Sequence, residues 1–209
     1  QIGTIHKGAA RTTDDLARNR PGADLMGFRF TSDYPAVEKA FLDLYGPEPR
    51  LLNIYLLHPN VEENLSSWRE LWVAGGLVHR CDGETCVIWR KPDGTYSQDP
   101  IPCPGPKERR TASGKTVIEQ CKPVTRLKVF LTDLRRAGYV LVQSSSVHDA
   151  ISLTEQLLAI AQEVRGNLQG VPMVLSRHPH KISVPGDGGQ RVRMAKSLLA
   201  LEISPTWID

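Results

Sequence analysis

The sequence LVHRCDGETCVIWR, residues 77–90, decides how the chain is interpreted. Its centre, Asp82–Gly83, is one of the strongest signals for a tight turn between two antiparallel strands. The stretch therefore predicts a β-hairpin, and the hairpin carries Cys81 on one arm and Cys86 on the other. The elements around this hairpin are expected to build the rest of the fold.

Before the hairpin, alternation over residues 26–31 predicts a strand, with Phe28 and Phe30 on its buried face. A helix is expected to follow, capped by Ser32 or Asp33 and stopped at Gly46. Residues 51–57 have the length and apolar character of a strand. The spacing of Trp68, Leu71 and Trp72 fits one face of a helix ending at Gly75–Gly76.

After the hairpin, residues 91–120 form a long, Pro-rich polar stretch, which is unusual in a compact domain unless something organises it. Strands are then predicted over 127–131, 139–143, 171–175, 181–184 and 191–203, and the clearest helix over 148–165. This mixture, without regular βαβ spacing, predicts an α+β fold: a mixed or antiparallel sheet, a few helices and an inserted four-cysteine loop module. We expect residues 1–25 to form an N-terminal arm, residues 26–209 a domain, and residues 77–123 a zinc-binding insertion.

All four cysteines of the chain fall between residues 81 and 121: Cys81, Cys86, Cys103 and Cys121. Four thiolates suit a closed, tetrahedral zinc site, and metal binding would fix a loop that has little core of its own. Two disulfides, buried free thiols and an iron–sulfur cluster remain as alternatives. His79 could replace one cysteine as a ligand, although a surface histidine is the expected reading.

Composition and charge exclude several classes of protein. The chain is 40% hydrophobic and 23% charged, which is ordinary for a globular protein. No apolar run approaches the ~20 residues that span a bilayer, and residues 1–20 lack an apolar signal segment. We therefore expect a protein of the bacterial cytoplasm, associated with the nucleoid, with no membrane partner.

Two segments are rich in basic residues although the net charge is only +3. Such patches suit an acidic partner or the phosphates of DNA, and equally a solvated surface. The candidate binding residues are Arg109, Arg110, Lys115, Arg177, Lys181, Arg191, Arg193 and Lys196.

No catalytic constellation is expected. Ser144, Ser145 and Ser146 precede His148 and Asp149, but such adjacency does not suit a triad assembled in space, and a helix N-cap is the better interpretation. A metal closed by four cysteines leaves no position for a reactive water. No small-molecule substrate is expected either.

Several short motifs give the chain a resemblance to a known family. They are Gly27-Phe28-Arg29-Phe30-Thr31-Ser32, Trp68-Arg69-Glu70-Leu71-Trp72 with Gly75–Gly76, Arg80-Cys81-Asp82-Gly83, Cys103-Pro104, Cys121-Lys122-Pro123-Val124-Thr125-Arg126-Leu127 and the closing hairpin, Ile182 to Ile203. In these motifs the chain resembles phage recombination directionality factors, the partners of large serine integrases, over roughly residues 25–208. Related proteins are labelled putative metal-binding.

The resemblance implies a non-enzymatic factor that binds an integrase on DNA and switches it from integration to excision. It also implies a metal site shared at the four cysteine positions. We expect Trp68 and Trp72 to contribute to the surface that meets the integrase. The alternatives are a nucleic-acid-binding protein that binds or anneals single strands, and, less favoured, a metal hydrolase.

Overall fold

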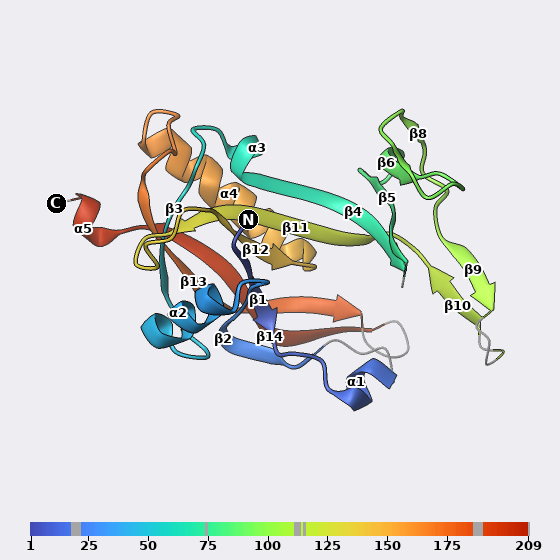
Figure 1. Ribbon diagram of the computed structural model, residues 1–209, viewed down its shortest axis with the longest axis horizontal. Helices are drawn as coiled ribbons and strands as arrows, with labels where there is room; N and C mark the ends of the chain where they lie inside the picture. Colours follow the sequence, from blue (N-terminus) through green and yellow to red (C-terminus); the bar gives the residue numbers. More distant parts are fainter. Residues whose placement is uncertain (18–21, 74, 111–113, 115, 186–189, 209) are drawn as a thin grey trace. The chain divides into compact units, whose positions relative to one another are not determined.

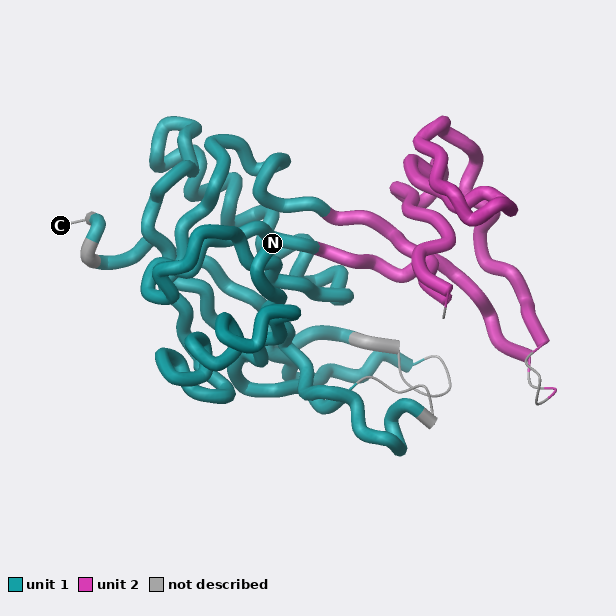
Figure 2. The backbone as a smooth tube through the Cα atoms, in the orientation of Figure 1, with its two compact units in different colours: residues 1–66, 126–209 teal, residues 67–125 magenta. Residues whose placement is uncertain are grey.

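The structure is a computed structural model that describes residues 1–17, 22–73, 75–110, 114, 116–185 and 190–208. The chain divides into two compact units (Figure 2), residues 1–66 with 126–209 (unit 1) and residues 67–125 (unit 2). The fold is α+β with a mixed sheet, as the sequence predicts. No helix among the described residues is long and apolar enough to cross a membrane.

Unit 1 contains most of the helices and strands (Figure 1). Its elements are β1 (Gly3–Gly8), α1 (Thr13–Ala17), β2 (Asp24–Thr31), α2 (Pro35–Tyr45), β3 (Leu52–Tyr55), α3 (Val61–Asn64), β12 (Val140–Ser144), α4 (Val147–Glu163), β13 (Pro172–Pro185), β14 (Arg191–Ile203) and α5 (Pro205–Ile208). Two strands, β4 (Leu65–Val73) and β11 (Lys122–Leu131), run from one unit into the other.

The sheet of unit 1 joins strands from both ends of the chain. One run follows the order β14, β13, β3, β11; β12 pairs with β11 and with β1, and β1 pairs with β2. β1 and β12 are parallel, from Gly3 opposite Val140 to His6 opposite Gln143, whereas β1 and β2 are antiparallel. A core of buried apolar side chains, among them Phe28, centres on this sheet.

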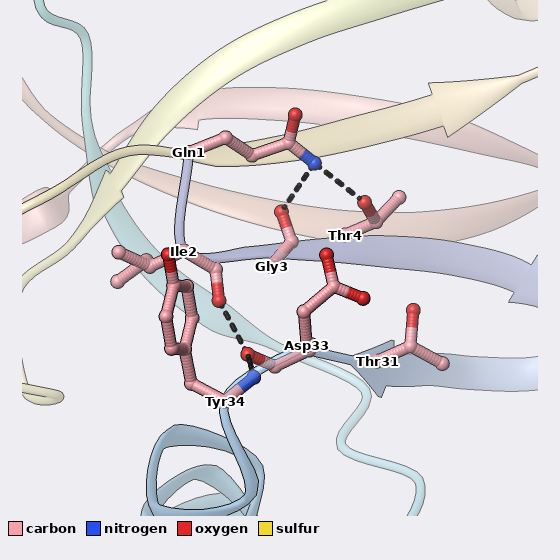
Figure 3. Close-up of a pocket in the computed structure, with 8 residues that line it drawn as sticks. Gln1, Ile2, Gly3, Thr4, Thr31, Asp33 and Tyr34 are labelled. Atoms are coloured by element: carbon pink, nitrogen blue, oxygen red, sulfur yellow. Dashed lines mark hydrogen bonds between the residues drawn. The ribbon is translucent and has the colours of Figure 1, made fainter.

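The N-terminal segment differs from the predicted arm. Residues 3–8 form β1, whose Ile5 is fully buried between two neighbouring strands. At the start of β1, Ser32 donates a hydrogen bond to the Ile2 carbonyl and accepts one from the backbone N–H of Tyr34 (Figure 3). Residues 1–4 and 31–34 line a small polar pocket of about 220 Å³ at this place. The sequence did not reveal this strand, because its parallel partner β12 lies far away in the sequence.

Helix α4 covers strand β14 through polar side chains. Ser146 caps the helix by accepting a hydrogen bond from the backbone N–H of Asp149. Asp149 Oδ1 accepts from the backbone N–H of Leu199 at 3.0 Å, and Gln156 Oε1 accepts from that of Leu201 at 2.5 Å. The otherwise open strand edge is thereby occupied, which removes a template for pairing with another chain.

Unit 2 consists of short strands. They are β5 (Gly76–Cys81), β6 (Thr85–Arg90), β7 (Tyr96–Ser97), β8 (Ile101–Pro102), β9 (Lys107–Arg110) and β10 (Thr116–Glu119). β4, β5, β6 and β7 follow one another in a sheet, β8 also pairs with β6, and β9 pairs with β10. The predicted hairpin at residues 77–90 is confirmed. The predicted helix at residues 66–75 is wrong, because β4 pairs with β5 there.

Candidate metal centre

The four cysteines come together in unit 2 because short strands return the chain to one hairpin. Cys81 and Cys86 lie opposite each other on β5 and β6. β8 pairs with β6, and the backbone N–H of Cys103 donates to the Glu84 carbonyl at 2.6 Å, which holds Cys103 against the turn. Cys121 comes directly before β11. Local pairing therefore organises the stretch that the sequence left without a core.

The distances between sulfur atoms suit a shared metal ion. Cys81 Sγ lies 3.5 Å from both Cys103 Sγ and Cys121 Sγ, and the last two are 4.0 Å apart. Ligands about 2.3 Å from a tetrahedral zinc ion stand about 3.8 Å from one another. The donor atoms of Cys86, Cys103 and His79 also lie within 4.8 Å of one another. These five residues, the cysteine cluster, can hold a metal ion.

His79 belongs to this cluster and is not the surface residue that was expected. Its side chain is 5% exposed, and its Nε2 lies 2.9 Å from Cys121 Sγ. Burial, with the positive charge of Lys107, lowers the pKa of His79 below its ordinary value. The sequence contained a signal for this position of His79, because alternation along a strand puts residues 79 and 81 on the same face.

Burial makes most of these thiols hard to ionise without a cation. It raises the pKa of Cys81 and Cys121, and that of Cys86 to about 12. Burial also opposes ionisation of Cys103, but hydrogen bonds from the Gly105 backbone and from neighbouring thiols hold the pKa of Cys103 below its ordinary value. Several thiolates this close repel one another, and a divalent cation removes that repulsion while displacing the protons.

The surroundings of the cluster suit a structural ion. Leu71, Trp89 and Ile101 pack against the sulfurs as partly buried apolar side chains. On another side, a cavity of about 230 Å³ borders Cys81, Cys103 and Cys121 and gives a path by which an ion can enter.

The opposite face of β4 carries the predicted tryptophans. Residues 68, 70 and 72 share that face because strand side chains alternate. Trp72 is 56% exposed, and its Nε1 donates to Glu70 Oε2 at 2.8 Å. Glu70 is buried and accepts a second hydrogen bond from Arg80 Nε at 2.7 Å. Trp68 is partly buried. The indole of Trp72 is thus held in place at the surface, which the sequence did not reveal.

The predicted basic residues are divided between the two units. In unit 2, Arg109 and Arg110 are exposed on β9, with Arg109 paired to Glu119 at 2.5 Å. Lys115 lies outside the described residues. In unit 1, the register of β13 and β14 puts Lys181 on one face with residues 191 and 193, and Lys196 on the other.

The side chain of Arg177 is buried and has a structural role, so it is not part of an exposed surface. Its guanidinium group is buried and donates to the carbonyl oxygens of Lys7 (3.1 Å), Leu25 and Ser197 (2.9 Å). It also pairs with Asp24 at 2.7 Å. Arg177 therefore links β13 to β1, β2 and β14. The assignment of Arg177 to a binding patch was wrong because these acceptors are not visible in its local sequence.

Comparison with known proteins adds one result. A family model described as "Gp3-like: Recombination directionality factor-like" matches residues 2–201, almost the whole chain. No curated protein and no solved structure gives a significant match.

Proposed function

Since the chain belongs to the Gp3-like family of recombination directionality factor-like proteins, we propose that it binds a serine integrase on DNA and switches that enzyme from integration to excision. The observation that carries the proposal is the extent of the match, which includes both units. The family implies a phage protein, a recombinase as partner and a role other than catalysis. Such a factor would act on DNA-bound integrase in the bacterial cytoplasm.

The physical basis of the switch is a difference in affinity. A factor changes the balance between two arrangements of an integrase only if it binds one of them more tightly. Shifting that balance from 1:99 to 99:1 takes a preference of about 10⁴-fold. A rigid contact surface raises the affinity for the arrangement that it fits, because little conformational freedom is lost on binding.

We assign Trp68 and Trp72 to that surface and zinc to the cysteine cluster. Tryptophan dominates many protein interfaces, and Trp72 is held ready for contact by Glu70. Zinc would be structural: with four cysteine ligands its coordination shell is closed, and an iron–sulfur cluster is the less favoured occupant. His79 would then donate its Nε2–H to the Cys121 thiolate, a hydrogen bond that orients the ligand.

The proposal is tested by an excision assay with the integrase encoded beside this protein. We expect the wild-type protein to promote recombination between the two hybrid sites that flank an integrated element. Trp72→Ala should weaken integrase binding about 30-fold or more and reduce the excision rate accordingly, since an interface hot spot costs about 2 kcal/mol or more. Trp207→Ala, which removes a 48% exposed tryptophan from unit 1, is the matched control. Failure of the wild-type protein to alter any integrase–DNA complex would refute the proposal.

A second function is direct binding of single-stranded nucleic acid. It is favoured by the shared face of Lys181, Arg191 and Arg193 on the β13–β14 hairpin. Binding through these residues would weaken steeply with salt, because each phosphate contact releases counterions. Arg191→Gln with Arg193→Gln should flatten that salt dependence. An unchanged slope would exclude this face.

A further inference from the structure

Unit 1 contains a polar pocket of about 480 Å³ that the proposed function does not use. It is lined by residues from β1, β2, β12, β14 and the segments that adjoin them, and we call it the basic pocket. Its residues are His6, Lys7, Gly8, Ala9, Gly22, Asp24, Arg29, Gln143, Ser144, Ser145, Ser146 and Lys196. Its volume lies in the range of ordinary small-molecule sites.

Two of the charges in the wall are already neutralised. Lys7 forms an ion pair with the buried carboxylate of Asp149, which also accepts a hydrogen bond from Ser144. Asp24 pairs with the buried guanidinium of Arg177. These ion pairs hold the wall of the basic pocket in place and add no net charge to it.

Two positive charges remain. Arg29 donates from Nε to the Gly8 carbonyl at 3.1 Å, which anchors the guanidinium group in the wall. Lys196 projects from β14, and its side chain is exposed. Among the residues that the structure describes, neither cation has a carboxylate partner within 4.0 Å. The surplus charge therefore faces the basic pocket.

The neighbouring histidine reports the same electrostatic surroundings. Burial, together with the positive charge of Arg29, lowers the pKa of His6. His6 Nε2 is also 2.9 Å from Thr31 Oγ1. A neutral His6 adds no charge, so the basic pocket keeps a net surplus of two positive charges.

We propose that the basic pocket binds a phosphomonoester, the terminal phosphate of a nucleotide or of a nucleic-acid strand. A phosphomonoester carries close to two negative charges at pH 7 and three acceptor oxygens. It therefore matches two uncompensated cations, whereas each phosphodiester within a nucleic-acid backbone carries only one negative charge. Arg29 can hold two of the oxygens with its guanidinium fork and Lys196 the third. Gln143, Ser145 and Ser146 supply neutral polar groups for the remainder of the ligand.

The test is calorimetric titration with adenosine 5′-monophosphate at low salt, with adenosine as the unphosphorylated probe. We expect only the monophosphate to bind, and Lys196→Gln to raise its Kd about 10-fold or more, as for the loss of a charged hydrogen bond. Lys39→Gln makes the same change of charge on the exposed side of helix α2, away from the basic pocket, and should leave Kd within about 2-fold. Unchanged melting of both variants confirms that they fold.

A second titration distinguishes the sources of the phosphate. A short DNA strand with a 5′-phosphate is compared with the same strand without one. Tighter binding of the phosphorylated strand than of the monophosphate would identify a strand end as the source, and the reverse order a free nucleotide. Equal effects of the two lysine variants, or no preference for the phosphorylated form in either titration, would overturn the proposal. Because the basic pocket lies wholly in unit 1, none of these outcomes depends on the cysteine cluster or on an integrase.

Discussion

If the cysteine cluster binds a metal as proposed, removing that metal should unfold unit 2 and leave unit 1 folded. The perturbation is a strong chelator, or the double variant Cys81→Ser/Cys121→Ser. Unit 1 has a large core of its own, whereas the cluster of buried residues in unit 2 consists of Cys81, Cys86 and Cys121. Loss of the proposed ion would remove the centre that joins the cysteine ligands from three distant parts of the chain.

The expected loss of folding free energy is comparable with the whole stability of an ordinary domain or exceeds it. Structural zinc contributes about 10–16 kcal/mol of apparent folding free energy in small zinc-binding peptides. Whole domains are stable by only about 5–15 kcal/mol. Loss of the ion should therefore leave the folded form of unit 2 as a minor population, not as a loosened version of the same structure.

The distribution of aromatic residues provides the assay. Three of the four tryptophans, Trp68, Trp72 and Trp89, lie in unit 2, whereas the longest helix, α4, lies in unit 1. Chelation should shift tryptophan fluorescence to longer wavelength while the helical circular-dichroism signal persists. Added zinc should reverse the shift in the wild-type protein and not in the double variant. The reasoning would be refuted by metal-free protein whose tryptophan fluorescence already shows a folded unit 2 and does not change when zinc is added.

Two further predictions concern unit 1. Asp149→Asn should destabilise the protein by about 3 kcal/mol in chemical denaturation, because it leaves Lys7 without its buried partner. Glu155→Gln, on the exposed side of α4, should change the stability by less than about 0.5 kcal/mol. Burial, with the nearby carboxylate of Asp133, raises the pKa of Tyr45 to about 12, whereas tyrosine in the unfolded chain has a pKa of about 10. Tyr45 therefore ionises first in the unfolded state, and the stability of the protein should fall as the pH rises from about 10 to about 12. Tyr45→Phe should abolish that part of the pH dependence, and an identical alkaline slope in the variant would contradict the assignment.

The sequence predicted those parts of the fold that have local signals. The Asp82–Gly83 turn located the β5–β6 hairpin, and the cap at Ser146 located the start of α4. The four cysteines were expected to meet, and they do. Each of these signals lies within or beside the element that it predicts.

The errors arose where distant partners decide the structure. Trp68, Leu71 and Trp72 have spacing that suits a helix, yet pairing with β5 makes the segment a strand, and Arg80 supplies the partner that lets Glu70 be buried. Likewise, β1 has no periodicity to reveal it, because its position depends on β12. Periodicity within a short segment does not contain this information.

The two faces of β4 suggest why the proposed metal site and an exposed tryptophan lie in the same small unit. A strand that keeps Trp72 at its surface, braced by a buried carboxylate, gives up much of the apolar burial that would otherwise stabilise it. The other face, with Leu71 against the cysteine cluster, can make up the loss only if the cluster binds an ion. The two perturbations should therefore differ in kind. Trp72→Ala should weaken binding of the integrase while unit 2 stays folded, whereas chelation should abolish binding and the fold of unit 2 together. If chelated protein still bound the integrase with unchanged affinity, the contact surface would have to lie in unit 1.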